Sequence, residues 1–561
     1  MALQIKATKK AVVSGPRSVG KGSHAETKSG KPVYQIKTPP CQFTCPSSED
    51  IRGYLTAIAQ ADEYGRPHDD STALAWERLT DMNPIPATMG RVCPHPCQTG
   101  CNRKDHDSAV GINSVEQYIG DFALTKGLKF KKSGEAKSKK VAVVGSGPAG
   151  LSAAYQLARR GYPVVMFEAY DQTGGMLRYG IPPYRLPRNI LDAEVQRILD
   201  LGVELRLNTR IGRDVPFDQL LSDFDAVFMG NGCHKGKLMG IAGEDSPNVL
   251  TGAEYLNRML SGESVDLGKR VLVVGGGDSA VDAARVALRA GAEVTMLYRR
   301  TRQEMPAISR DVDEALAEGV KLDLLVAPKA VVVENGRAVG LECYRMELGE
   351  PDASGRRKPV TVAGSEFIAS CDAIIAAVSQ EPDLSGQESV ANQWGWIDVE
   401  KTGKTKLEKV FAGGDVLNIS LVTTAVGQGR VAAENIDRYL SGEPLKEPGN
   451  LNVIYYKDMK IASSFYAKSE NNKRGHKPAP SLLGNYDELL IPLTKEQVIA
   501  ESKRCMSCGM CFDCDNCYMF CSDSAVIRQP KGSHFKFDWD KCSRCDKCYN
   551  QCPCGYIDWV E

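Results

Sequence analysis

The amino-acid sequence predicts an α/β protein built on two Rossmann-like units, with a small helical domain before them and a small α+β module after them. Two observations predict the core. An apolar strand, a glycine-rich turn and a helical segment surround Gly145, and the same pattern returns 130 residues later at Gly275. A third observation predicts the flanking modules, because the cysteines are concentrated near the two ends of the chain. Five lie in Cys41–Cys101 and eleven lie in Cys505–Cys554.

The first glycine-rich turn has the context that a dinucleotide fingerprint requires. Four apolar residues, Val141–Val144, lead into Gly145, and Gly147 and Gly150 follow before a helix-periodic segment. Glycines at this spacing permit a tight turn and bring a pyrophosphate close to the helix N-terminus. Glu168 ends the next apolar strand, where an acid accepts hydrogen bonds from a ribose. The alternative is a glycine turn within an ordinary α/β core.

The second turn differs from the first at the position of the ribose-binding acid. An offset of 130 residues places Tyr298 where Glu168 stands, and Arg299 and Arg300 follow it. A carboxylate repels a 2′-phosphate, whereas a guanidinium binds one, so the sequence favours NADPH over NADH. The alternative is that both arginines are solvated surface charges. The predicted contacts of this second site are Gly275, Gly277, Asp278, Ser279, Ala280, Arg299 and Arg300.

Composition excludes several classes of function. The 70 basic residues balance 70 acidic residues, so nothing indicates nucleic acid as a partner, and no run of 18 apolar residues predicts a membrane span. We expect residues 1–38 to form a flexible basic tail rather than a secretory signal; a transit peptide is the alternative. Clustered cysteines in a large α/β enzyme indicate metal thiolates in a reducing compartment, so we expect the protein in the cytoplasm.

Residues 39–135 are predicted to fold as a small helical domain around iron–sulfur clusters. Cys41 and Cys45 have a spacing looser than that of zinc ribbons, and Cys93, Cys97 and Cys101 lie within nine residues of one another. Three thiolates so close together suit a cubane better than a tetrahedral zinc. His95 lies between two prolines and is expected to be a fixed loop residue rather than a ligand.

The order of motifs predicts that the second unit is inserted into the first. We assign residues 136–255 and 373–445 to the first unit and residues 256–372 to the second. An apolar strand followed by Gly414 and Asp415 returns the chain to the first unit. Residues 446–500 are expected to be a linker.

Residues 501–561 resemble a bacterial two-cluster ferredoxin. They contain two runs of four cysteines with the spacing C-x2-C-x2-C-x3-C. In such modules the fourth cysteine of each run ligates the other cluster. The resemblance implies one cluster on Cys511, Cys514, Cys517 and Cys552, and another on Cys542, Cys545, Cys548 and Cys521. Ser522 replaces the usual proline, and Cys554 is surplus.

Four segments carry a resemblance to a known family: the first fingerprint, Arg178–Pro187, Tyr298–Pro306 and Phe411–Asp415. Through them, residues 39–445 resemble the small subunit of bacterial glutamate synthase. This resemblance implies a glutathione-reductase-like fold, shared with the nucleotide half of dihydropyrimidine dehydrogenase, with FAD in the first unit and NADPH in the second. The implied FAD contacts are Gly145, Gly147, Pro148, Ala149, Gly150, Glu168, Gly175, Met176, Leu177, Arg178, Gly414, Asp415, Thr424 and Ala425.

The same resemblance implies two cubanes in the helical domain, although this chain lacks the usual upstream cysteine pair. One cluster would take Cys45, Cys93, Cys97 and Glu116, with Gln117 as the alternative to the glutamate. The other would take Cys41 and Cys101, completed by Cys505 and Cys508 from the same chain or from the second protomer of a homodimer. We therefore expect four [4Fe–4S] clusters. The alternative is that the helical domain holds a single cluster and Cys505 and Cys508 are free thiols.

These cofactors predict an iron–sulfur flavoprotein that exchanges hydride between NADPH and FAD and passes single electrons through clusters. NADH remains an alternative donor. The expected partner is ferredoxin or a redox enzyme of the sulfite reductase, 2-oxoacid oxidoreductase or glutamate synthase large-subunit class. Alternatives are a true glutamate synthase small subunit, an electron-bifurcating transhydrogenase subunit, and a redox-sensing scaffold without turnover. Isolated Cys233, Cys343 and Cys371 make a disulfide reductase an unfavourable interpretation.

Overall fold

The computed structural model describes residues 29–352, 355–459, 465–478, 481 and 483–561. The chain divides into two compact units. One unit combines Met1–Ile36, Met459–Phe465 and Met510–Glu561, and the other combines Lys37–Asp458 and Tyr466–Gly509. Segments far apart in sequence therefore belong to the same unit in both cases.

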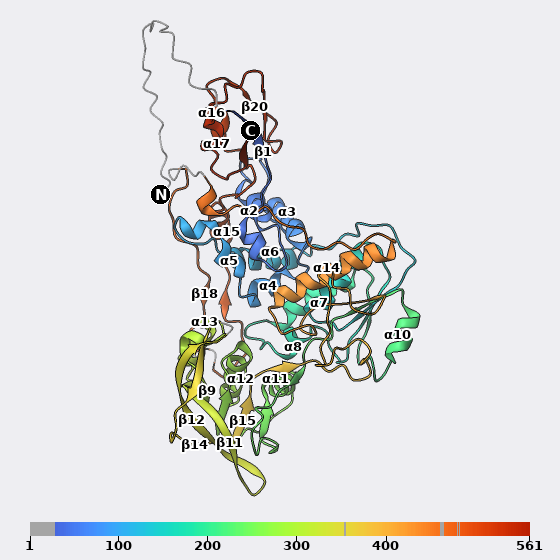
Figure 1. The fold of residues 1–561 in the computed structure, drawn as a ribbon, viewed down its shortest axis with the longest axis vertical. Coiled ribbons are helices and arrows are strands. Elements are labelled where there is room, and N and C mark those ends of the chain that lie inside the picture. The colour runs from blue at the N-terminus through green and yellow to red at the C-terminus, as the bar shows by residue number, and fades with distance from the viewer. Residues whose placement is uncertain (1–28, 353–354, 460–464, 479–480, 482) are drawn as a thin grey trace. The chain divides into compact units, whose positions relative to one another are not determined.

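The core of the larger unit is a five-stranded parallel sheet with the order β17-β5-β2-β3-β4. Its central strand β2 is completely buried, and so are its neighbours, which explains why all three are continuous apolar runs. Helix α7 follows β2 and packs against α14 (Figure 1). The strands are β2 (Val141–Val144), β3 (Val164–Phe167), β4 (Glu204–Arg206), β5 (Ala226–Met229) and β17 (Val410–Ala412); the helices are α7 (Pro148–Arg159), α8 (Met176–Tyr179), α9 (Arg188–Leu199), α10 (Phe217–Asp223) and α14 (Val422–Leu440).

Small residues let α7 and α14 approach closely. A Cβ atom on Gly429 would lie 2.2 Å from the carbonyl oxygen of Ala149. The Ser152 hydroxyl on α7 donates to the Val426 carbonyl on α14 over 2.8 Å. The late helix α14 is thus fixed directly on the helix that follows the first glycine-rich turn.

A second five-stranded parallel sheet has the order β10-β9-β8-β15-β7. The prediction that the units exchange at 255 and 373 is wrong in detail, because β7 and β15 belong to this second sheet. The crossover lies instead at the short antiparallel pair of β6 (Lys235–Gly236) and β16 (Gln380–Glu381). The other elements of this part are β7 (Val249–Thr251), α11 (Gly252–Leu260), β8 (Arg270–Val274), α12 (Asp278–Arg289), β9 (Glu293–Tyr298), η2 (Arg302–Glu304), α13 (Ser309–Glu318), β10 (Lys321–Leu324) and β15 (Ala373–Ala376).

An antiparallel sheet lies between β10 and β15 in the sequence. Strand β12 pairs with β11, β13 and β14. The strands are β11 (Val326–Glu334), β12 (Arg337–Pro351), β13 (Arg357–Thr361) and β14 (Phe367–Ser370). Arg300, which follows β9, donates from Nε to the carbonyl of Arg357 on β13 over 2.8 Å.

The N-terminal part of the larger unit is helical, as expected. Its helices α2, α3 and α6 pack around a buried core that includes Tyr54, Leu79 and Ile119. Glu194 on α9 accepts hydrogen bonds from the first amides of α4, Ala87 N and Thr88 N, both over 2.7 Å. The elements are α1 (Pro40–Thr44), α2 (Ile51–Ala59), α3 (His68–Thr80), α4 (Pro86–Val92), α5 (Pro96–Gly100), η1 (Asn102–Asp105) and α6 (Ile112–Thr125).

Apart from Met459–Phe465, the segment interpreted as a linker belongs to the larger unit. Arg474 donates to the Gly90 carbonyl, to Gln117 Oε1 over 2.7 Å and to Asn113 Oδ1 over 2.7 Å. These hydrogen bonds explain the polar composition of the segment. They fix its backbone in place, so the segment does not need an apolar core of its own. The regular elements here are η3 (Tyr456–Asp458), β18 (Gly475–His476), β19 (Leu490–Ile491) and α15 (Lys495–Ser502).

The smaller unit contains the ferredoxin-like module and a strand from the other end of the chain. Strand β1 (Lys31–Tyr34) lies within the predicted tail, and it pairs antiparallel with β22 (Ile557–Val560). The tail prediction is therefore wrong for residues 31–34, and residues 1–28 lie outside the described part of the chain. The remaining elements are α16 (Asn516–Met519), β20 (Val526–Arg528), β21 (Phe535–Phe537) and α17 (Lys547–Asn550).

Candidate functional site

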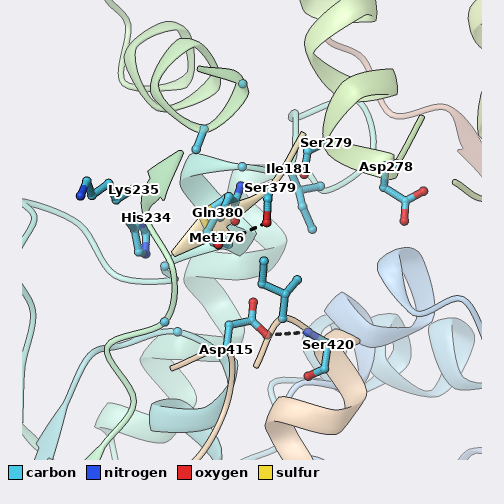
Figure 2. A pocket seen from close by; sticks show the side chains of 18 of the residues that line it. Met176, Ile181, His234, Lys235, Asp278, Ser279, Ser379, Gln380, Asp415 and Ser420 are labelled. Atoms are coloured by element: carbon cyan, nitrogen blue, oxygen red, sulfur yellow. Dashed lines mark hydrogen bonds between the residues drawn. The ribbon is translucent and has the colours of Figure 1, made fainter. Parts of the chain in front are cut away.

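One cavity of about 920 Å³ in the larger unit is lined by both glycine-rich turns. The first turn contributes Gly145–Ala149, and the second contributes Gly275–Ser279. Both turns follow the central strand of their parallel sheet, where doubly wound folds bind ligands. Figure 2 shows Met176, Ile181 and His234 around this space. The volume lies at the upper end of the range for small-molecule pockets and suits two extended ligands that meet.

The glycines of the first turn have two distinct roles. Gly145 has a φ of 92°, and a Cβ atom on it would lie 2.4 Å from the Gly230 carbonyl oxygen. A Cβ on Gly150 would lie 1.9 Å from the Gly145 oxygen, so these two glycines are required by packing. Gly147 lines the cavity, and a Cβ there would meet nothing closer than 3.9 Å. The open side of Gly147 is the cradle that a pyrophosphate fits.

Glu168 is buried beside this turn and also lines the cavity. Its Oε2 accepts from Ser146 N over 2.9 Å, and its Oε1 accepts from Tyr170 N over 3.0 Å. These backbone bonds hold the carboxylate at the end of β3, the position from which an acid reaches a ribose.

The predicted FAD contacts in the segment 175–178 reach the cavity only in part. Gly175, Met176 and Leu177 line it. Arg178 does not: its guanidinium is buried, pairs with Asp192 and donates from Nε to the Thr173 carbonyl over 2.5 Å. The prediction of Arg178 as an FAD contact is therefore unsupported by its position, and the residue instead fixes the turn.

Gly414 and Asp415 lie at the end of β17, on the cavity wall. Asp415 Oδ1 accepts from Ser420 N over 3.0 Å (Figure 2), and burial raises the pKa of its carboxyl group. Ala425 lines the same wall, whereas the predicted contact Thr424 does not. Pro148 and Ala149 at the start of α7 also line the cavity, and a Cβ atom on Gly414 would lie 2.9 Å from the Ala149 Cβ.

The second turn repeats this construction. Gly275 has a φ of 150°, and a Cβ atom on it would lie 2.4 Å from the Ala377 oxygen. A Cβ on Gly277 would meet nothing closer than 4.0 Å, so its open side faces the cavity. Asp278 accepts from Ile308 N over 2.9 Å, and Ser279 lines the wall. Ala280 is fully buried behind the turn and does not line the cavity.

The two predicted phosphate-binding arginines have different environments, although both line the cavity. Arg299 is exposed. Arg300 is buried, pairs with Asp352 over 2.6 Å and donates from Nε to the Arg357 carbonyl over 2.8 Å. Arg356 lines the same end and was missed in the sequence because it lies outside both fingerprints. Arg299 and Arg356 are therefore the better placed cations, and Arg300 has a structural ion pair.

Three cysteines and two carboxylates meet in the helical part. Cys93 caps α4, Cys97 lies on α5, and Cys45 caps α1. Burial, together with the carboxylates of Glu49 and Glu116, raises the pKa of the Cys45 thiol to about 12. Burial also raises the pKa of Cys97 well above its usual range, with Cys45 and Cys93 as the next causes. The four predicted donors of this set therefore converge.

Glu49 is a functional candidate that the sequence did not single out. Asn83 Nδ2 donates to Glu49 Oε1 over 3.1 Å and to Glu116 Oε1 over 2.8 Å, which joins the two buried carboxylates. Burial raises the pKa of Glu49 to about 7. Gln117, the alternative ligand, is directed elsewhere, because its Oε1 accepts from Arg474. A glutamate one turn after Cys45 was the only signal in the sequence.

Cys505 and Cys508, the pair expected to complete the second cluster, lie near the cysteines of the helical part within the same chain. Burial raises the pKa of Cys41 well above its usual range, followed in effect by Cys101, Cys505 and Cys508. Arg52 donates to the Cys508 carbonyl over 2.8 Å, and Asn102 Nδ2 lies 3.4 Å from Cys508 Sγ. Helix α15 packs on α2 and α6 and so positions this loop.

The smaller unit groups the remaining cysteines into the two predicted sets. Burial and the neighbours Cys511, Cys514 and Cys552 raise the pKa of Cys517 above its usual range. Burial and Cys542, Cys545 and Cys521 likewise raise the pKa of Cys548 to about 12. A small cavity is lined by Cys521, Cys542, Cys545 and Cys548 together. The surplus Cys554 has its Sγ 3.7 Å from Cys552 Sγ.

The cysteine sets fit clusters better than single zinc ions. A tetrahedral zinc with bonds of about 2.3 Å holds its sulfurs about 3.8 Å apart. Within the described part of the chain, no three cysteine sulfurs lie within 4.8 Å of one another. Backbone amides also point at the sulfurs, as in His95 N to Cys93 Sγ over 3.3 Å and Ala525 N to Cys521 Sγ over 3.2 Å. Such bonds favour thiolates and tune iron–sulfur centres. His95 therefore contributes its backbone amide.

Comparison with known proteins agrees with this geometry. Residues 139–429 match the family described as pyridine nucleotide-disulphide oxidoreductase, and residues 20–128 match dihydropyrimidine dehydrogenase domain II, 4Fe-4S cluster. The chain is 37% identical over 430 residues to the glutamate synthase [NADPH] small chain of Escherichia coli, an alignment that covers 72% of this chain and 89% of that one. The chain belongs to this family of NADPH-dependent oxidoreductases. The resemblance predicted from the sequence is thereby confirmed.

Two other members of the family share more of this chain. NADP(+)-dependent formate dehydrogenase subunit beta of Moorella thermoacetica is 43% identical over 470 residues, 78% of this chain and 65% of that protein. NADPH-Fe(3+) oxidoreductase subunit beta of Geobacter sulfurreducens is 39% identical over 517 residues, 84% of this chain and 75% of that protein. The chain thus spans just under two thirds of the first relative and three quarters of the second.

Membership of the family confirms the α/β class with an iron–sulfur domain before the nucleotide-binding part. Among the described residues, no helix has both the length and the apolar character needed to cross a bilayer. Cys233 is buried, and its thiol donates to the Asp415 carbonyl over 3.0 Å, while Cys343 and Cys371 are buried in an apolar core.

Proposed function

We propose that this protein is an iron–sulfur flavoprotein that oxidises NADPH, or forms it, through FAD and four [4Fe–4S] clusters. The observation that carries the proposal is the single cavity that both glycine-rich turns line. Two dinucleotides bound with their pyrophosphates on these turns would have their reactive rings in one enclosed space. We assign FAD to the turn with Glu168 and NADPH to the turn with Arg299.

The residues of the chain have positioning roles in this proposal. Gly147 and Gly277 leave room for the pyrophosphates, and Glu168 and Asp415 accept hydrogen bonds from hydroxyl groups of the FAD. A bound flavin takes up a hydride and releases its electrons one at a time, which neither nicotinamide nor a cubane does alone. No acid or base from a side chain is required for that exchange.

The first cluster is proposed on Cys45, Cys93, Cys97 and Glu116, beside the flavin. Val92 and Pro94, the neighbours of Cys93, both line the large cavity. The loop after Cys45 packs against the start of α14, where Ser47 Oγ lies 2.8 Å from Thr423 Oγ1. A cluster held here would lie next to the wall formed by Ala425, which suits electron transfer from the flavin.

The second cluster is proposed on Cys41, Cys101, Cys505 and Cys508, and the third and fourth on the eight cysteines of the ferredoxin-like module. Cys508 and Cys511 are three residues apart. The chain therefore connects the ligands of the second cluster directly to those of the third. Electrons would pass in either direction between the flavin and the C-terminal module.

The redox partner is proposed to be ferredoxin or a complex-forming enzyme. The named relatives are subunits of a formate dehydrogenase, an iron(III) reductase and a glutamate synthase, which supports a partner that this chain serves with electrons. We favour the cytoplasm as the compartment, because fifteen of the sixteen proposed donors are cysteines that must stay reduced. Electron bifurcation is a second interpretation that the same cofactors permit.

Anaerobic addition of NADPH to the purified protein tests the proposal. We expect flavin reduction, followed by electron paramagnetic resonance signals of reduced clusters and by reduction of a viologen dye. Absence of flavin reduction by both NADPH and NADH would overturn it. Oxidation of NADPH that requires glutamine and the large subunit would instead favour the glutamate synthase function.

A further inference from the structure

Strand β1 brings two side chains from the N-terminal end to the cysteines of the ferredoxin-like module. Residues 32 and 34 lie on one face of the strand, because side chains alternate with a period of two. Pro32 is buried and lines the small cavity together with Cys521, Cys542, Cys545 and Cys548. Tyr34 lies next along that face. The strand therefore contacts the neighbourhood of both predicted clusters.

Tyr34 is held tightly in this position. Its ring stacks on Phe537 with the centroids 4.4 Å apart and on Tyr556 with the centroids 5.1 Å apart. The pairing of β1 with β22 aligns Tyr34 with Ile557. The two stacked rings and the strand pairing together fix the direction in which the hydroxyl group points.

The hydroxyl oxygen of Tyr34 is buried and has no hydrogen-bond partner of normal geometry among the described residues. A buried hydroxyl without a partner costs about 1–3 kcal/mol, so a native structure normally supplies one. The Tyr34 side chain packs against the core of this module, which contains the predicted ligands Cys517, Cys548 and Cys552. The sulfurs of these ligands are the acceptors that this core offers to the unpaired hydroxyl group.

We propose that Tyr34 donates a hydrogen bond to the sulfur of Cys517 when the cluster on Cys511, Cys514, Cys517 and Cys552 is present, and so raises the reduction potential of that cluster. The N-terminal strand is then a functional part of the C-terminal electron-transfer module. This inference rests on the proposed function, because it requires clusters in that module. Hydrogen bonds to sulfur are among the established determinants of such potentials.

The test is a redox titration of Tyr34→Phe in the full chain, followed by electron paramagnetic resonance. The ring and its stacking remain, and only the donor is lost. A bond worth ~1.4 kcal/mol corresponds to about a tenfold change in the ratio of reduced to oxidised cluster, or ~59 mV for a one-electron couple. We expect one cluster to shift to lower potential by about this amount while the iron content stays at the wild-type value.

Tyr518→Phe is the matched control. Tyr518 is adjacent to Cys517 in the chain, but its ring is exposed and lies over Arg528. We expect no shift from this variant. Unchanged potentials in Tyr34→Phe, or equal shifts in both variants, would overturn the inference.

A second measurement compares the vibrational spectra of the wild-type protein and Tyr34→Phe. Exchange into D₂O should shift the iron–sulfur stretching bands in resonance Raman spectra, and this isotope shift should be reduced in Tyr34→Phe. If Tyr34→Phe loses iron, absence of any isotope shift in the wild type would still refute the hydrogen bond. Absence of cluster signals in the wild type would refute the proposed function itself, so the two failures are distinguishable.

Discussion

Because Arg299 and Arg300 have different environments, replacing Arg299 by alanine should affect coenzyme binding, and replacing Arg300 by alanine should affect stability. Arg299 is an exposed cation on the cavity wall, whereas Arg300 is committed to Asp352 and to the Arg357 carbonyl. Loss of a charge-assisted hydrogen bond to a 2′-phosphate costs about 1.5–3 kcal/mol, which corresponds to roughly a 10- to 150-fold increase in KM for NADPH. The KM for NADH should stay within about twofold in Arg299→Ala, since NADH has no phosphate at that position.

Arg300→Ala should act mainly on stability. Removing one partner of a fully buried pair costs about 3–5 kcal/mol. The Asp352 side chain is 28% exposed and can be rehydrated, so a loss of about 1–3 kcal/mol is the better expectation. Thermal unfolding and steady-state kinetics with both coenzymes measure the two effects. This division of roles would be refuted if Arg300→Ala raised the KM for NADPH relative to that for NADH as much as Arg299→Ala does, and left the thermal stability unchanged.

Three further predictions concern the first turn, the buried carboxylates and the segment after α14. Gly147→Ala should fold but lose FAD, because its Cβ enters the cavity without a clash with the protein. Gly150→Ala should lose at least about 1–3 kcal/mol of stability, because its Cβ would contact the backbone. Equal flavin content in the folded forms of the two variants would contradict this. Glu116→Ala should alter the spectrum or iron content of one cluster, while Glu49→Gln should keep the wild-type iron content. If Glu49→Gln altered the cluster and Glu116→Ala did not, Glu49 would be the ligand instead of Glu116. Arg474→Met should destabilise the protein by about 2–4 kcal/mol in denaturant unfolding, since three hydrogen bonds of a partly buried guanidinium are lost. An unchanged unfolding midpoint would restore the linker interpretation.

The sequence predicts the parts of this fold in which chemistry depends on local spacing. The glycines of both turns and the cysteine runs have fixed separations, so their strand–turn–helix and cluster contexts follow from the residues alone. The family resemblance implied the convergence of Cys505 and Cys508 on the N-terminal cysteines, because it required two more ligands than the helical domain supplies. The class of fold and the family are confirmed, while the ligand assignments remain predictions.

Contacts between distant segments were not predictable in the same way. The sequence contains no local signal that Lys31–Tyr34 pairs with the last strand or that Arg474 binds Gln117, because both depend on tertiary pairing. The strand Ala373–Ala376 was assigned to the wrong sheet, since an apolar run does not specify its neighbours. Arginines such as Arg178 and Arg300 often contact ligands, yet each of these two forms an ion pair within the protein.

The ratio of iron to flavin tests most directly the claim that both ends of the chain complete one electron-transfer path. We expect about sixteen iron atoms per flavin in the wild-type protein, and about twelve when Cys505 and Cys508 are both replaced by serine. Cys343→Ser is the matched control, because that thiol is buried in an apolar core and should leave the ratio unchanged. A wild-type ratio near twelve that the double substitution leaves unchanged would contradict the account.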